Sequence, residues 1–138
     1  RRHPHPMTVH FPIVFAFSAA VFTLLYLLTG MAGFESTALN CLGAGLLFTP
    51  VAMTTGYFTW WLNYEARPLR AVIIKQILSW LLIGMEMTAF VWRLAVPDIL
   101  GPFRAASALY LVCILSLIPL VSVIGWFGAS LTFPIEKE

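Results

Sequence analysis

The apolar positions of this chain form four long runs, too continuous to be the short alternating pattern of strands. Crossing the hydrocarbon core of a bilayer, about 30 Å thick, takes about 20 residues of helix. The runs that meet this length cover residues 10–30, 37–62, 71–96 and 104–133. The links between them are short and are polar or contain glycine and proline: residues 31–36, 63–70 and 97–103.

This pattern predicts an all-α integral membrane bundle of four transmembrane helices. Strands are not expected, because an open sheet cannot satisfy its backbone hydrogen bonds in lipid. Links this short place consecutive helices antiparallel to each other, which gives an up-down topology. We expect residues 1–138 to form a single transmembrane domain.

Composition supports an integral membrane protein and argues against several other functional classes. The chain is 60% hydrophobic and 10% charged, whereas soluble domains average about 25% charged residues. A net charge of +2 gives no reason to expect nucleic-acid binding. Cys41 and Cys113 lie far apart in apolar segments and form no zinc or disulfide pattern. With no hydrolase or phosphate-loop motif either, we expect no catalytic residues and no enzyme activity from this chain alone.

The basic residues predict the orientation. With four spans, both termini and the link 63–70 share one side of the membrane. That side holds six basic residues, Arg1, Arg2, Arg67, Arg70, Lys75 and Lys137. The other side holds Arg93 and Arg104, together with Glu35 and Asp98. The positive-inside rule therefore predicts a multi-pass protein of the cell inner membrane with both termini in the cytoplasm.

The first candidate site is a histidine cluster just ahead of the first span. His3, His5 and His10 are the three histidines of the chain, and prolines stand between them. Prolines restrict the backbone, so we expect this segment to be extended rather than helical up to His10, which begins the first span.

Imidazole binds metals, relays protons and can hydrogen-bond a quinone carbonyl. One hypothesis makes His10 or His5 an axial ligand of a b-type haem, whose second ligand would then be His3 or His5, a Met, a Lys or a residue of another subunit. A second makes the three histidines a copper or zinc site. In a third, His10 contacts a quinone or a proton path. The alternative to all three is that the histidines only cap the bundle; which metal, if any, stays open.

The second candidate site is a stripe along the third span. Lys75, Glu86 and Arg93 lie within about 20° of one another on a helix that turns about 100° per residue. Ionisable groups in a transmembrane helix face the bundle interior or a protein partner. Glu86, in mid-span, should pair with a cation or remain protonated. The stripe could therefore carry protons, line the path to a quinone, or lock the third helix against a partner subunit.

The segment His5-Pro6-Met7-Thr8-Val9-His10-Phe11-Pro12-Ile13 resembles the opening of a known family. Its members are small four-helix bacterial membrane proteins of unknown function, with His-Pro-Met/Leu-x-Val-His-Phe-Pro ahead of the first span. The later residues Thr55-Gly56, Trp60-Trp61 and Arg67 or Arg70 are similar to that family's exit from the second helix. The resemblance implies the four-helix fold and a redox role.

Family members often carry another histidine at the start of the third helix. Here that stretch reads Arg70-Ala71-Val72-Ile73-Ile74-Lys75-Gln76, without histidine. A haem or quinone site would then be shared with a neighbour, or this member has lost the site. We therefore expect a membrane subunit of a respiratory or other electron-transfer complex, contacting lipid and other membrane subunits and contributing to a b-haem or quinone site. The alternatives are a structural accessory subunit without cofactor and a small proton- or solute-conducting bundle.

Overall fold

The computed structural model describes residues 5–132, and this range contains only helices and their connections. A one-turn helix, α1 (His5–Thr8), precedes four long ones. The long helices are α2 (His10–Thr29), α3 (Ala32–Tyr64), α4 (Arg70–Ala95) and α5 (Ala105–Thr132). The predicted all-α class is confirmed.

All four long helices have the length and apolar composition needed to cross a membrane. The shortest is α2, whose 20 residues extend about 30 Å, matching the hydrocarbon core. Lipid offers no hydrogen bonds, so each backbone N–H must bond within its own segment, and an apolar run becomes a helix. Large apolar side chains such as Leu28, Leu47 and Trp126 are exposed on the outside of the bundle. Four membrane-spanning helices were predicted, and the structure has four helices of the required length and apolar composition.

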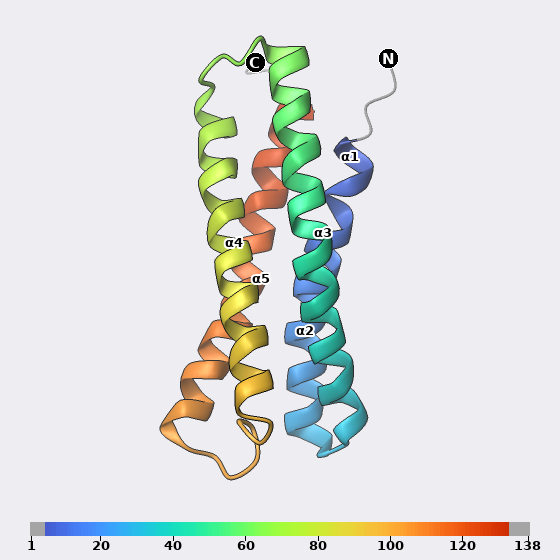
Figure 1. The fold of residues 1–138 in the computed structure, drawn as a ribbon, viewed down its shortest axis with the longest axis vertical. Coiled ribbons are helices and arrows are strands. Elements are labelled where there is room, and N and C mark those ends of the chain that lie inside the picture. Colours follow the sequence, from blue (N-terminus) through green and yellow to red (C-terminus); the bar gives the residue numbers. More distant parts are fainter. Residues whose placement is uncertain (1–4, 133–138) are drawn as a thin grey trace, which may run out of the picture.

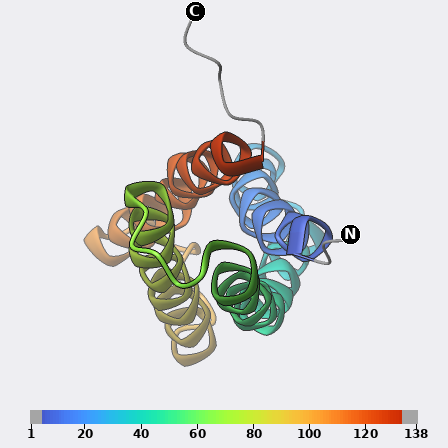
Figure 2. The ribbon, with the colours of Figure 1, turned by 90° about the horizontal axis from the view of Figure 1, so that it is seen from above.

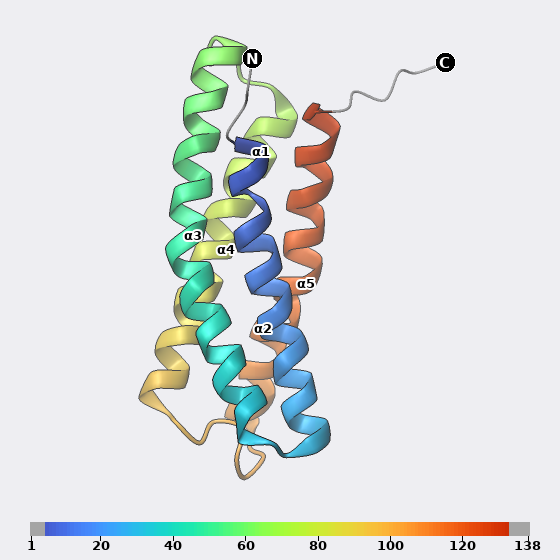
Figure 3. The ribbon, with the colours of Figure 1, turned by 90° about the vertical axis from the view of Figure 1, so that its right-hand side faces the viewer.

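The long helices form a ring of antiparallel neighbours, as the short links predicted. Seen along the bundle axis, they follow one another in the order α2, α3, α4, α5, and α5 closes the ring against α2 (Figure 2). The α3–α4 connection lies at the same end as α1 and the last turn of α5 (Figure 1), which we call the terminal end. The other two connections lie at the opposite end (Figure 3).

The second span begins earlier than expected. The link predicted at residues 31–36 is mostly helical, since α3 already begins at Ala32. Gly30 ends α2 in the left-handed conformation, with φ of 70°, and its N–H donates to the Tyr26 carbonyl at 2.7 Å. Glycine adopts this conformation without strain, so a single residue stops α2 and the chain turns at once.

The segment before the first span also differs from expectation. Residues 5–8 were expected to be extended, but they form α1, which continues almost directly into α2. Pro6 is the second residue of this helix, where its missing N–H would have no intrahelical partner in any case. The Thr8 hydroxyl lies 2.8 Å from that of Thr55 on α3 and ties α1 to the bundle.

Small residues let the helices approach closely in the interior. Ala16, Ala19 and Ala20 of α2 are completely buried. On α3, a methyl group added at Gly43 would lie 3.2 Å from the ring of Phe90 on α4. Small side chains at helix contacts are typical of membrane bundles, where packing replaces the hydrophobic effect. Among these apolar contacts lies one acidic side chain, Glu86 of α4, which is 0% exposed.

Candidate functional site

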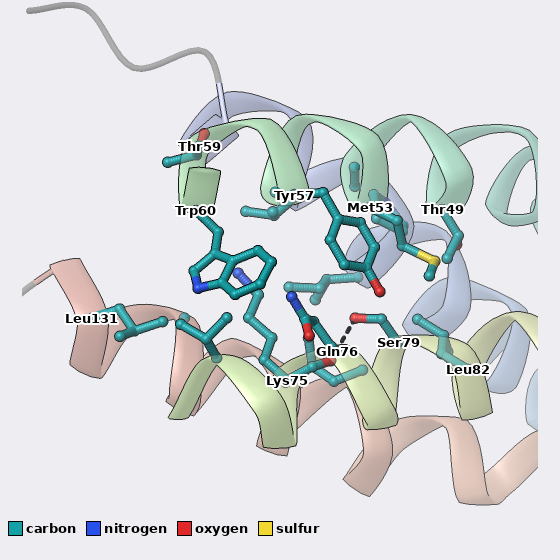
Figure 4. Close-up of a pocket in the computed structure, with 18 of the residues that line it drawn as sticks. Thr49, Met53, Tyr57, Thr59, Trp60, Lys75, Gln76, Ser79, Leu82 and Leu131 are labelled. Atoms are coloured by element: carbon teal, nitrogen blue, oxygen red, sulfur yellow. Dashed lines mark hydrogen bonds between the residues drawn. The ribbon is translucent and has the colours of Figure 1, made fainter. Parts of the chain in front are cut away.

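A cavity of about 310 Å³ lies inside the bundle at the terminal end. Its lining residues come from all four long helices and from Val9, the residue between α1 and α2. Figure 4 shows the α3 side chains on one wall and the α4 side chains opposite them. We call this space the terminal cavity. It extends from Leu131 near the end of α5 to Thr49 in the middle of α3.

Aromatic side chains of α3 form one wall of the terminal cavity: Tyr57, Trp60 and Tyr64. Their polar atoms are held in place. Trp60 donates its indole N–H to the Arg67 carbonyl at 2.7 Å, and the Tyr57 hydroxyl accepts from Trp80 of α4 at 3.1 Å. These bonds fix the rings as a rigid apolar surface against which a planar molecule could stack.

Polar side chains of α4 face this wall. Lys75, Gln76 and Ser79 lie within about one helical turn and line the terminal cavity (Figure 4). Ser79 bonds back to the Lys75 carbonyl at 2.8 Å. The Lys75 ammonium reaches α5, where a methyl group added at Gly128 would lie 3.5 Å from it. Among the described lining residues, Lys75 is the one with a basic or acidic side chain, so the cavity favours a ligand that accepts hydrogen bonds.

The amino-terminal motif borders the cavity through its apolar residues. Val9, Pro12 and Ile13 line it, whereas His10 does not and is exposed on α2. His3 lies outside the described residues, as does the side chain of His5. Within the described part of the chain, no three His, Cys, Asp or Glu side chains are close enough to hold a metal ion. The structure thus brings the motif to a cavity but directs His10 away from it.

The stripe on α4 reaches three different surroundings. Lys75 lines the terminal cavity. Glu86 accepts a hydrogen bond from the Thr49 hydroxyl of α3 at 2.9 Å. Arg93 lies near the opposite end, with Nε 2.8 Å from Oε1 of Glu35, and both side chains are only 15% exposed. Within the described chain the Arg93 N–H at Nε is not aligned for a hydrogen bond, so this contact is ionic.

Thr49 connects the cavity and the buried carboxyl group. Its side chain is 2% exposed, lines the terminal cavity and bonds Glu86. The Thr49 hydroxyl therefore links the cavity, whose lining is mostly apolar, to the buried Glu86. Lys75 lies in the outer part of the cavity.

A family model described as "Predicted membrane protein (DUF2231)" matches residues 2–136. The chain belongs to this family. The match covers all four long helices, so the expected membership of a membrane-protein family of unknown function is confirmed at that level. Comparisons with the curated proteins and with the solved structures give no match.

Several residues of this DUF2231 member were not recognised as site residues from the sequence. Tyr57, Trp60 and Tyr64 fit an interfacial aromatic belt equally well, and Gln76 stands next to the more prominent Lys75. A signal did exist, since Lys75, Gln76 and Ser79 place three polar side chains within five residues of an apolar span. Thr49 gave no such signal, because threonines on membrane helices commonly bond their own backbone.

Proposed function

We propose that the protein is a quinone-binding membrane subunit of an electron-transfer complex. The terminal cavity carries this proposal. It combines an aromatic wall from α3 with hydrogen-bond donors from α4, and it lies at the end of the bundle where a lipid-soluble ligand would enter from the interface. The chain would bind and position the quinone, while another subunit performs the electron transfer.

The donor set suits the two carbonyl oxygens of a quinone. Lys75 and Gln76 both carry N–H donors. The quinone ring would lie against Trp60 or Tyr57, since aromatic rings stack on flat conjugated molecules. The volume of about 310 Å³ is at the lower end of the range for small-molecule sites, about 300 to 1,000 Å³. A headgroup of one or two rings therefore suits the cavity, with its isoprenoid tail in the lipid.

A haem is supported less well than a quinone. A b-type haem needs two strong axial ligands, and His10 is exposed on the bundle surface. Its partner would have to be His3, His5 or a residue of another subunit, as expected from the missing histidine near Arg70. A haem would thus sit at the outer edge of the bundle between subunits, whereas a quinone fits inside this chain.

The basic residues around the cavity favour the cytoplasmic side. Arg67, Arg70 and Lys75 all belong to the terminal end. By the positive-inside rule, that end faces the cytoplasm and the protein is an inner-membrane protein. The quinone site would then exchange protons with the cytoplasm.

Quinone binding can be measured by quenching of tryptophan fluorescence in detergent. A short-chain benzoquinone should quench the wild-type protein saturably, and Trp60→Phe should remove most of this quenching. Trp126→Phe is the matched control, because its ring is exposed on the outer surface and does not line the cavity. Non-saturable quenching, or equal loss in both variants, would exclude the cavity as the quinone site.

Lys75→Met tests the polar wall. Losing a charged donor costs about 1.5 to 3 kcal/mol, which weakens binding about tenfold or more. Arg70→Met removes a neighbouring cation that does not line the cavity, so the affinity should remain within about twofold of wild type. Equal affinities of Lys75→Met and wild type would contradict the proposal.

A structural accessory role is the second candidate. The pairs Glu86–Thr49 and Arg93–Glu35 both join α4 to α3. The two innermost ionisable groups of the stripe therefore already have partners on α3 that hold the bundle together. In this case the protein would bind no quinone, while Arg93→Met would still lower the thermal stability of the purified protein.

A further inference from the structure

Glu86 occupies a position where an acidic side chain is costly. It lies 16 residues into α4 and 9 residues before its end, so it is about 24 Å and about 14 Å from the two helix ends. It is completely buried. Carboxyl groups are rare in such places, and those that occur commonly have a function.

The two oxygens of this carboxyl group differ in their contacts. Oε2 accepts the hydrogen bond of Thr49 at 2.9 Å. Oε1 is buried and makes no hydrogen bond to any residue in the described range. It lies against Gly45 of α3, where an added methyl group would come within 2.6 Å of it. The absence of a side chain at Gly45 is what leaves room for the carboxyl group.

The cations on the same helix do not neutralise Glu86. Lys75 is eleven residues away along α4, or about 16 Å, and Arg93 is about 10 Å away in the other direction and is paired with Glu35.

The remaining titratable side chains on the packed helices supply no nearby positive charge either. They are Tyr26 and His10 on α2, Cys41, Tyr57 and Tyr64 on α3, and Tyr110 and Cys113 on α5. His10, the one group among these that can become a cation, begins α2 at the terminal end. An ionised Glu86 would therefore be a buried charge without a counter-ion, and the neutral acid is the form that this environment accepts.

Toward the terminal end, one hydroxyl group connects Glu86 to the cavity. Thr49 touches both the carboxyl group and the cavity. A hydroxyl group can donate one hydrogen bond and accept others at the same time. Release begins from the neutral acid: the Glu86 proton passes to Thr49 Oγ1 while the proton already on that oxygen leaves into the cavity. Uptake begins from the ionised carboxylate and is the reverse: a proton arriving from the cavity binds to Thr49 Oγ1 while the proton already on that oxygen moves to Glu86 Oε2. Thr49 is unchanged afterwards, and Glu86 has gained one proton.

The path toward the opposite end is closed by packing. Leu42 and Ala89 are 1% and 0% exposed, and Phe90 lies against Gly43. The Arg93–Glu35 pair follows at the next level. None of these residues lines the terminal cavity.

We propose that Glu86 is a proton-binding site that exchanges its proton with the terminal cavity through Thr49, and with that end of the bundle alone. The ligand is the proton, and the site needs no quinone to work. It gives the protein a proton half-path from the terminal end to the middle of the membrane.

Infrared spectroscopy of the purified protein in lipid tests the site directly. Wild-type protein should show the C=O stretch of a protonated carboxylic acid, and transfer into D₂O should shift this band while the fold is retained. Glu86→Gln should abolish the band. Glu35→Gln is the matched control and should retain it, because the Glu35 carboxylate is paired with Arg93. A band that persists in Glu86→Gln, or no band at all in wild type, overturns the proposal.

Thr49→Val tests the route. The valine has nearly the same shape but no hydroxyl, so the exchange of the Glu86 band into D₂O should slow about tenfold or more, as expected when a hydrogen-bonded relay is removed. An unchanged rate would rule out Thr49 as the relay. This measurement depends on wild type and Thr49→Val alone, so it remains decisive if Glu86→Gln does not fold.

One-sided access is tested with two single cysteines and a bulky thiol reagent. Thr59 lines the terminal cavity (Figure 4), and Gly33 lies in open space near the opposite end. Labelling Thr59→Cys should slow deuterium exchange at Glu86, and labelling Gly33→Cys should leave it unchanged. The reverse result, or no effect from either label, would overturn the half-path. Because no quinone is added, failure here is distinct from failure of quinone binding.

Discussion

Gly45 and Glu86 are so close that a methyl group on Gly45 would lie 2.6 Å from Oε1 of the carboxyl group. Real side-chain carbons do not approach other atoms this closely. Gly45→Ala therefore forces Glu86 away from its position and strains the bond from Thr49. We expect a loss of about 1 to 3 kcal/mol in the free energy of unfolding, as for other overpacked cores.

The matched control is Gly84→Ala. Gly84 also lies within a helix, but nothing stands within 4 Å of the added methyl group. Alanine favours helix by about 1 kcal/mol over glycine, so this variant should be as stable as wild type or slightly more stable. Thermal unfolding in detergent, followed by circular dichroism, measures both. Equal stability of Gly45→Ala and Gly84→Ala would contradict the close contact.

The Arg93–Glu35 pair should contribute measurably to stability. Its side chains are 15% exposed, so water screens the interaction only partly. We expect Arg93→Met or Glu35→Gln alone to cost about 1 to 3 kcal/mol, because each leaves a poorly hydrated charge without its partner. The double variant should cost less than the sum of the single changes, which a double-mutant cycle reveals.

An exposed pair provides the comparison. Arg67 and Glu65 are 2.9 Å apart but 73% and 76% exposed. Replacing Glu65 by Gln should change stability by less than about 1 kcal/mol. If Glu65→Gln costs as much as Glu35→Gln, burial does not explain the strength of the inner pair.

The fold was predictable because an apolar run of sufficient length can form only a helix in lipid. The exact start of α3 was not predictable, because Glu35 and Ser36 look like link residues. In the structure Glu35 is tolerated in the first turn of the helix because it meets Arg93. That contact depends on how α3 and α4 are rotated and shifted against each other, which hydropathy does not specify.

The site was predictable only in part, for the same reason. Lys75 and Glu86 stand out in an apolar span, and both lie on the inner side of α4. The role of Thr49 depends on the axial level at which α3 passes α4. His10 drew attention by its type, but the rotation of α2 turns Pro12 inward and leaves His10 exposed.

The orientation can be tested with reporter fusions. A reporter fused after residue 138 should be active in the cytoplasm, because the terminal end holds most of the basic residues. A reporter inserted at Phe103, which is 67% exposed in the α4–α5 connection, should read on the other side. If the reporter after residue 138 reads outside the cytoplasm and the reporter at Phe103 reads inside it, the orientation is reversed and the topology is kept.

Filling the terminal cavity from α5 should block ligand binding without unfolding the protein. Gly128 lines the cavity beside Lys75, and a methyl group there would lie at an ordinary contact distance of 3.5 Å from the ammonium. Gly128→Ala should therefore be tolerated, whereas Gly128→Leu should occupy space that a quinone ring needs. We expect the leucine variant to keep its unfolding temperature and to lose quinone affinity about tenfold or more, since a blocked headgroup forfeits its hydrogen bonds. Fluorescence titration beside thermal unfolding separates the two effects, and undiminished quinone binding by Gly128→Leu would place the ligand elsewhere.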